Sequence, residues 1–420
     1  MMENTGHAWL PLLFLGLAAA FCSCKEEIPM VSLGIDDRYA VARMQALVLH
    51  PRFDGDGYLW TMPDSAGDET VVSTSRDFVF CKAVPGEYDL RLRIEDKTNP
   101  YVHDVHIVVW EEEVAYSRYI AKVYEYCPAP GQFVNVMPEY EPGNTYADML
   151  EKAEESISGT NDGMVSLGAF GGYITFGFDH SVVNVPGEYD FKILGNAFYA
   201  SETPDPDDPY SGGSAEPGIV MVSFDRNGNG IPDDEWYELA GSEYYKPQTK
   251  HGYRITYHRP DPLKPATPDE RNPSVTDTSY IRFTDNEGGT GHVAKVVFYN
   301  QEYFPCWVNE ASLTFGGTKL ADNAVDESGN GSGYVQHAYD WGYVDNHPNG
   351  VRDKSSFDIG WAVDGNGYPV DLPCIDFVRV YTGVSQSCGW LGEISTEVSR
   401  AEDLHVEERL RDGRMKNDER

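Results

Sequence analysis

The clearest pattern in the chain is a run of alternating apolar and charged residues in its first quarter. In the segment 88–95, Tyr88, Leu90, Leu92 and Ile94 alternate with Asp89, Arg91, Arg93 and Glu95. Because successive side chains of a strand point to opposite faces, the pattern predicts a half-buried strand of a β-sandwich. Further strands are predicted at 46–49, 58–62, 77–81 and 105–110, and turn signals such as Gly55-Asp56-Gly57 and Pro85-Gly86 separate them.

Strand and turn patterns return from Val165 onward, where Ile174, Phe176 and Phe178 alternate on one face. About nine short strands over the following 230 residues are typical of a jelly-roll-like β-sandwich. The best helix candidate is Thr145 to Ile157, since Asn144 or Thr145 can cap it and Met149, Ala153 and Ile157 share a face. We therefore expect an all-β protein: an N-terminal immunoglobulin/PKD-like sandwich, then a larger jelly-roll-like sandwich with one short helix.

Changes of composition along the chain suggest five segments. They are a lipoprotein signal peptide (1–23), a spacer domain of the immunoglobulin/PKD type (24–113), a proline-rich linker (114–144), the jelly-roll-like ligand-binding domain (145–400) and a charged C-terminal tail (401–420). The PKD assignment is a resemblance, which depends on the domain length, on Trp60 in mid-domain and on Gly86-Glu87-Tyr88 opening a late strand.

The N-terminus resembles a lipoprotein export signal. An apolar run of about 14 residues, Ala8 to Phe21, is short for a membrane-spanning helix and suits a signal peptide. Cleavage after Ser23 would leave Cys24 as the acylated N-terminus, and Cys24-Lys25-Glu26-Glu27 resembles the acidic signal of lipoproteins that face outward from the outer membrane. We expect a lipid-anchored protein of the outer-membrane surface; the alternative is a plain secreted or periplasmic protein. The segment before the apolar run departs from the usual signal because it contains no Lys or Arg.

Net charge and cysteine content restrict the partners. A formal charge of −36 argues against binding to nucleic acid or to anionic lipid head groups, apart from the anchor itself, and leaves cations and neutral or basic ligands. The same charge is also explained by solubility alone. Cleavage before Cys24 leaves five cysteines, an odd number that is not typical of a disulfide framework, although Cys374 and Cys388 could close a C-terminal loop. The five are Cys81, Cys127, Cys306, Cys374 and Cys388.

The strongest chemical motif is the segment 225–235. Oxygen side chains at relative positions 1, 3, 5 and 9, a glycine at position 6 and a free carbonyl at position 7 match the ligand spacing of calcium loops. The segment resembles loops of the thrombospondin type 3 and dockerin kinds, with Asp234 or Glu235 as the closing carboxylate. We expect a structural Ca²⁺ there, and the alternative is a metal-free turn. The predicted ligands are Asp225, Asn227, Asn229, the Ile231 carbonyl, Asp233 and Glu235.

Catalytic motifs of hydrolases, metalloproteases and nucleotide-binding enzymes are absent from the sequence. We therefore expect a binding protein rather than an enzyme, while a glycoside hydrolase, which needs only two carboxylates, stays open. Aromatic residues beside Gly, Asn or Pro are candidates for a ligand platform, because flat rings on loops suit sugars or planar cofactors. The candidates are Trp236, Tyr237, Tyr339 and Trp341; core packing is the alternative for at least half of the rings.

Several long segments between 165 and 400 resemble a family of bacterial cell-surface lipoproteins. They are 171–179, 195–198, 216–223, 236–242 and 357–364. Members often carry a leading PKD-like module and accompany outer-membrane transporters for vitamin B12. The resemblance implies capture of a nutrient ligand, a cobamide, for a TonB-dependent transporter; the alternative is a glycan-binding or adhesive surface module.

Overall fold

The computed structural model describes residues 33–64, 66–97, 100–111, 115–200 and 212–406. The predicted signal peptide 1–23 and the predicted anchor Cys24 lie outside these residues. The described part is built from strands, one α-helix and three short 3-10 helices at Arg352–Lys354, Ile359–Trp361 and Gly389–Leu391. The predicted all-β class with one helix is confirmed. Among the described residues, no helix has the length and apolar character needed to cross a membrane.

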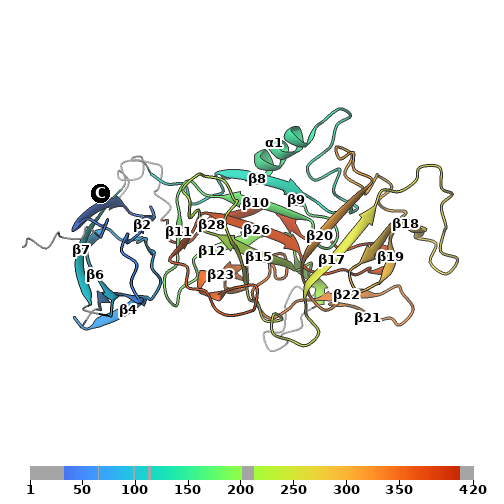
Figure 1. Cartoon of the computed structure of the whole chain (residues 1–420). Coiled ribbons are helices and arrows are strands. Elements are labelled where there is room, and N and C mark those ends of the chain that lie inside the picture. The colour runs from blue at the N-terminus through green and yellow to red at the C-terminus, as the bar shows by residue number, and fades with distance from the viewer. Residues whose placement is uncertain (1–32, 65, 98–99, 112–114, 201–211, 407–420) are drawn as a thin grey trace, which may run out of the picture.

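The N-terminal part is a five-stranded sheet with a small second pair of strands opposite it (Figure 1). In the sheet order the strands are β1 (Arg38–Ala42), β7 (Tyr101–Trp110), β6 (Gly86–Glu95), β3 (Gly57–Pro63) and β4 (Glu69–Ser73); the pair is β2 (Leu47–Leu49) with β5 (Phe78–Phe80). The alternation predicted for β6 is confirmed, since Leu90, Leu92 and Ile94 are buried and the charged residues are exposed. These residues pack around Trp60, which stacks on Phe78.

A six-stranded sheet forms the centre of the remaining chain. Its order is β24 (Ala362–Val363), β16 (Trp236–Leu239), β15 (Gly218–Ser223), β26 (Phe377–Thr382), β10 (Tyr173–Gly177) and β8 (Lys122–Cys127). A three-stranded sheet packs opposite it: β23 (Ser356–Phe357), β12 (Phe191–Leu194) and β28 (Arg400–Asp403). Two short pairs complete this sandwich: β9 (Val165–Ser166) with β27 (Glu397–Val398), and β11 (Val182–Val183) with β25 (Cys374–Ile375).

Two further four-stranded sheets extend the molecule away from its N-terminal part (Figure 1). One is ordered β19 (Thr290–Val296), β18 (Val275–Asp285), β17 (Lys250–His258) and β20 (Ser312–Lys319). The other is ordered β13 (Phe198–Tyr199), β14 (Gly212–Ser214), β22 (Tyr334–His337) and β21 (Ala324–Asp326). The described part of the chain after Val165 therefore contains more strands than the nine or so that the sequence pattern predicts, and some of them, such as β17 and β18, are long.

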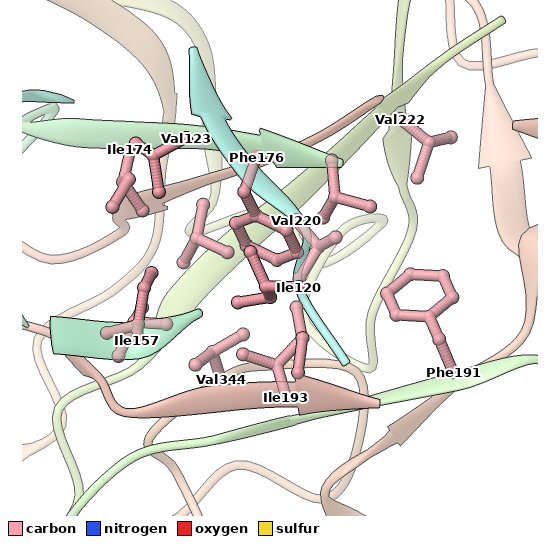
Figure 2. Close-up of a cluster of buried hydrophobic side chains, with 14 of the residues drawn as sticks. Ile120, Val123, Ile157, Ile174, Phe176, Phe191, Ile193, Val220, Val222 and Val344 are labelled. Carbon is pink, nitrogen blue, oxygen red and sulfur yellow. The ribbon is translucent and has the colours of Figure 1, made fainter. Parts of the chain in front are cut away.

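The main core lies between the six-stranded sheet, the three-stranded sheet and the helix. Figure 2 shows Phe176 of β10 in the middle of this cluster, with Val220 of β15 and Ile193 of β12 beside it. The helix α1 (Tyr146–Ile157) buries Met149, Ala153 and Ile157 against the same core. Thr145 caps the helix through a capping box with Asp148, as its sequence indicates.

Two predicted segment boundaries are wrong. Residues 122–127 lie in the predicted linker but form β8, an edge strand of the six-stranded sheet, because Val123 and Tyr126 belong to the main core. The predicted charged tail begins with β28, in which Ala401 is buried in the core and Asp403 is fully buried. Its acidic residues are not solvated there because they bind basic partners; residues 407–420 lie outside the described part.

A small shared core joins the N-terminal sheet to the rest of the chain. Met44 and Cys81 come from the N-terminal part, whereas Phe224 and Cys374 come from the sandwich, and all four are buried together. The Ser181 backbone N–H donates to the Met44 carbonyl at 3.0 Å across this junction. Cys374 therefore neighbours Cys81, while Cys388 lies in a different cluster, so the structure does not bring Cys374 and Cys388 together.

His180 connects β28 to the segment that follows β10. Its imidazole is fully buried between two carboxylates, with Nδ1 at 2.7 Å from Asp179 Oδ1 and Nε2 at 2.7 Å from Asp403 Oδ2. Burial alone would lower the pKa of His180, but hydrogen bonds and attraction to both carboxylates outweigh it and raise the pKa to about 9. The imidazolium therefore persists at neutral pH and links two elements far apart in sequence.

This arrangement predicts a specific pH dependence of stability. A histidine whose pKa is raised by folding stabilises the native state fully below about pH 6.5 and loses that contribution as pH rises through about 9. We expect the free energy of unfolding to fall by about 2–3 kcal/mol over this window because of His180. Urea unfolding of the wild type and of His180→Gln between pH 6 and 10 measures the difference, and the half-exposed His50→Gln is the control. Equal slopes for the wild type and His180→Gln would contradict the assignment.

Candidate functional site

The outer face of the six-stranded sheet carries a row of polar and aromatic side chains opposite the apolar core. In β26, Val378 and Val380 face the core, so Arg379 between them faces outward. The strand register places Arg379 beside Thr175 of β10, and Thr175 beside Glu125 of β8. The outer side of this sheet therefore carries polar side chains on β8, β10 and β26, while Ile219 and Tyr381 on the same side belong to a second apolar cluster.

Arg379 lies between two aromatic rings in this row. Its guanidinium is 4.2 Å from the Trp236 ring and 4.7 Å from the Tyr173 ring, and its Nη2 donates to Glu125 Oε2 at 2.6 Å. Thr175 Oγ1 accepts from Arg379 Nε at 2.9 Å and donates to Glu125 Oε2 at 2.8 Å. Such a stack holds an arginine in one orientation. We call Trp236, Arg379, Tyr173, Thr175 and Glu125 the arginine stack.

A small aromatic cavity borders the arginine stack at Tyr173. Its volume is about 250 Å³, and its walls include Tyr126, Tyr146, Tyr173, Trp307 and Cys127. The Tyr126 and Trp307 rings stack with 6.0 Å between their centres. Burial raises the pKa of both Tyr146 and Tyr173, so their hydroxyls stay protonated at neutral pH and can donate hydrogen bonds. The cavity thus combines flat apolar walls with a few polar atoms.

The structure separates the four aromatic residues proposed from the sequence. Trp236 belongs to the arginine stack, and Tyr237 points to the other face of β16, where it is 7 % exposed within the main core. Tyr339 packs on Tyr343 and donates to the Ala321 carbonyl. Trp341 packs on Trp361 with 4.7 Å between ring centres. The expectation of an exposed ligand platform at Tyr237 is therefore wrong, because adjacent residues of a strand face opposite sides.

The predicted calcium loop folds into a compact turn. The Asp225 carboxylate accepts from the backbone N–H groups of Asn229 (3.1 Å) and Gly230 (2.7 Å), and Gly228 and Gly230 have φ of 69° and 71°. Asp233 approaches from the far side and accepts from the Asn227 and Asn229 amides at 3.1 Å. The side chains of Asp225, Asn227, Asn229 and Asp233 therefore gather in one place.

The other two predicted ligands of the loop are less well placed. Glu235 Oε2 accepts from the Tyr237 hydroxyl at 2.7 Å, which turns this carboxylate toward the strand. The Ile231 carbonyl accepts from the Asp233 N–H at 2.8 Å. Asp234 Oδ2 accepts from the Arg226 N–H at 3.1 Å and so closes the loop from position 10. Of the two closing carboxylates considered, Asp234 is the one that contacts the loop.

The same turn occurs a second time, at 326–331, and this second turn was not predicted from the sequence. Asp326 Oδ2 accepts from the Gly331 N–H at 2.6 Å, and Gly329 and Gly331 have φ of 68° and 84°. The spacing of the aspartate and the two glycines equals that of Asp225, Gly228 and Gly230. In both loops, backbone N–H groups donate to the carboxylate of the first aspartate. The loop at Asp225 differs because it also contains a second carboxylate, Asp233.

A third acidic group was not predicted from the sequence and lies in the interior. Single carboxylate oxygens of Glu216, Asp345 and Glu397 all lie within 4.8 Å of one another, and this group, the buried triad, could hold a metal ion. Burial raises the pKa of Glu397 to about 8, with the Asp345 charge adding to the effect, and raises the pKa of Asp345 to about 6. Burial and the two neighbouring carboxylates raise the pKa of Glu216 well above its usual range.

Comparisons with known proteins add little to this geometry. No family model matches the chain, and no curated protein matches it. Among solved structures, the SusE-like protein BT2857 aligns with 87 % of this chain and 94 % of its own length, at 9 % sequence identity and a TM-score of 0.28. A match at this TM-score carries no argument about function. The association with vitamin B12 that the sequence resemblance implies finds no support in these comparisons.

Proposed function

We propose that this chain is a non-catalytic carbohydrate-binding protein, held at the bacterial surface by a lipid on Cys24. The observation that carries the proposal is the arginine stack beside the aromatic cavity. Trp236 and Tyr173 offer ring surface for the C–H faces of a sugar. The ion pair of Arg379 with Glu125 offers donors and acceptors of both signs for its hydroxyl groups.

Charge and size also support a neutral sugar as the ligand. The opposite charges of Arg379 and Glu125 compensate each other, and a chain with a net charge of −36 repels anionic ligands. The cavity of about 250 Å³ is small beside the pockets of about 300–1,000 Å³ that enclose drug-sized ligands. It can take one sugar ring of a longer chain, whereas a corrin macrocycle exceeds it. An outer-membrane transporter is the partner proposed to receive the captured ligand.

Glycan binding is tested with the mature protein on a glycan array, followed by calorimetry with the best oligosaccharide. We expect Trp236→Ala to weaken binding about tenfold or more, because one stacking surface and one support of Arg379 are lost. The matched control is Trp390→Ala, which removes a partly exposed tryptophan whose indole N–H bonds to Ser332 in another region.

Three results would contradict the proposal. They are retention of no glycan, equal losses for Trp236→Ala and Trp390→Ala, and release of reducing sugar from the bound glycan, which would indicate an enzyme. An absorbance titration with cyanocobalamin runs in parallel. Micromolar binding of cyanocobalamin without glycan binding would identify the ligand as a cobamide instead.

We also propose a structural Ca²⁺ in the loop of Asp225, Asn227, Asn229 and Asp233. Two carboxylates and two amides that meet at one point support it, since hard divalent cations favour carboxylate and amide oxygens. The Asn227 and Asn229 nitrogens face Asp233, and rotation of each amide would bring its oxygen to that position. The Ca²⁺ would fix the loop directly before Trp236, at one edge of the arginine stack. Calcium here therefore stabilises the proposed binding face rather than contacting the sugar.

The two similar loops provide the test of this calcium. We expect Ca²⁺ to raise the melting temperature of the EDTA-treated wild type by several degrees, as any ligand of the native state does. Asp233→Asn should reduce this increase, because it removes the second carboxylate, and Asp326→Asn in the other loop should leave it unchanged. Differential scanning calorimetry measures all three proteins. A Ca²⁺ effect that is the same for both variants would count against the loop at Asp225.

A further inference from the structure

We propose that the buried triad of Glu216, Asp345 and Glu397 is a second cation site, which takes a hard divalent ion of the Ca²⁺ class. This site is distinct from the surface loop at Asp225 and does not depend on the carbohydrate proposal. Its ligands come from three separate segments: Glu216 precedes β15, Asp345 follows β22 and Glu397 begins β27.

The spacing of the three carboxylates suits one central ion. Ca²⁺ binds oxygen at about 2.3–2.6 Å, so two ligands on opposite sides of one ion are about 5 Å apart. One oxygen from each member of the triad lies within 4.8 Å of the others. A single Ca²⁺ can therefore contact all three carboxylates with only small movements of the side chains.

Burial makes an uncompensated triad unfavourable. Asp345 is 3 % exposed and Glu397 is 1 % exposed, whereas Glu216 at the rim of the group is partly exposed. Within the described part of the chain, no Lys, Arg or His forms an ion pair with any member of the triad. Keeping all three carboxylates ionised at this position without a counter-ion would cost several kcal/mol per charge. A divalent cation supplies the compensating charge that the side chains around the triad do not.

An unpartnered buried hydroxyl points to the same position. Ser166 is fully buried, and its Oγ is directed at the Glu397 carboxylate without forming a hydrogen bond of normal geometry. Ser166 pairs directly with Glu397 across β9 and β27, so the two side chains lie on the same face of this small ladder. Buried hydroxyls are nearly always bonded, and a cation between the carboxylates would give Ser166 Oγ its missing partner.

The Asn196 amide helps to orient Asp345. With its nitrogen facing Asp345, this amide donates to Oδ1 at 3.1 Å and to Oδ2 at 3.3 Å. Asn196 therefore supports the Asp345 carboxylate from outside the proposed ligand set.

Hydrogen bonds around the triad orient its carboxylates. Asp345 Oδ1 accepts from the backbone N–H groups of Asn196 and Ala197 at 2.7 Å, and its Oδ2 accepts from the Glu397 N–H at 3.0 Å. Ser395 Oγ donates to Glu397 Oε1 at 3.0 Å. Such outer contacts are typical of metal ligands, and an all-oxygen donor set selects Ca²⁺, Mg²⁺ or Mn²⁺. Ca²⁺ suits this set best because Mg²⁺ keeps several of its waters, for which a buried site has little room.

The proposed ion lies close behind the aromatic cavity. The Tyr126 hydroxyl, whose ring forms part of the cavity wall, donates to the Ser166 carbonyl at 2.9 Å. Asp345 directly follows Val344, which lies in the main core in Figure 2. An ion in the triad would therefore contact residues on two sides. Through Ser166 and Glu397 it would connect to Tyr126 in the cavity wall, and through Asp345 to Val344 in the main core.

The test measures bound Ca²⁺ in variants that separate the two cation sites. The full mature protein carrying Asp233→Asn, which disables the surface loop, is dialysed against EDTA and then against Ca²⁺. Elemental analysis should find about one Ca²⁺ per chain. Adding Glu397→Gln, which keeps the shape but removes the charge, should reduce this to about zero. The matched control is Glu393→Gln, because Glu393 is an equally buried glutamate four residues away that is not part of the triad.

Each outcome decides for or against the site. Loss of Ca²⁺ in Glu397→Gln but not in Glu393→Gln supports it. No residual Ca²⁺ in Asp233→Asn, or the same content in both glutamine variants, overturns it. If circular dichroism shows that Glu397→Gln is unfolded, Ser166→Ala replaces it, since this change removes one neutral ligand. It should then weaken Ca²⁺ binding about tenfold in a titration with a chromophoric chelator, and an unchanged affinity would overturn the proposal.

Discussion

The alternation of side chains along β26 is the constraint on which the rest of the structure depends. Val378 and Val380 enter the main core, and this fixes Arg379 and Tyr381 on the other side of the sheet. A shift of the strand by one residue would place a guanidinium among Phe176, Val220 and Ile193 and would expose two valines. The free energy of core packing therefore also sets the position of Arg379, and with it the arginine stack.

The outer face of the six-stranded sheet shows how charged side chains can lie on the middle strands of a sheet. Arg379 is only partly exposed, yet its charge is compensated by Glu125 and its flat faces contact two aromatic rings. Arginine tolerates this environment better than lysine, because its guanidinium is planar and more weakly hydrated. The buried triad has the opposite character, since the side chains around it offer hydrogen bonds but no positive charge. The arginine stack and the buried triad lie in one domain, but their charges are compensated differently. Arg379 pairs with a side chain, whereas the triad needs a charge from outside the chain.

The sequence was informative wherever a signal is local. The alternation around Leu90 and Leu92, the capped helix from Thr145 and the spacing in the loop at Asp225 each occupy fewer than 15 residues, and all three correspond to regular features of the structure. The arginine stack and the buried triad were not predicted, because their members are brought together only by strand pairing. Glu216, Asp345 and Glu397 each resemble an ordinary acidic residue of an acidic chain. Tyr237 was misjudged because the sequence does not show which face of its short strand is turned to the core, and β16 turns Tyr237 inward.

The core of Met44, Cys81, Phe224 and Cys374 has a mechanical consequence. Two domains joined only by a flexible linker would point in many directions, whereas a shared apolar core resists rotation at the junction. The N-terminal sheet and the sandwich then keep a fixed orientation relative to each other. The direction in which the outer face of the six-stranded sheet points is consequently tied to the orientation of the N-terminal sheet.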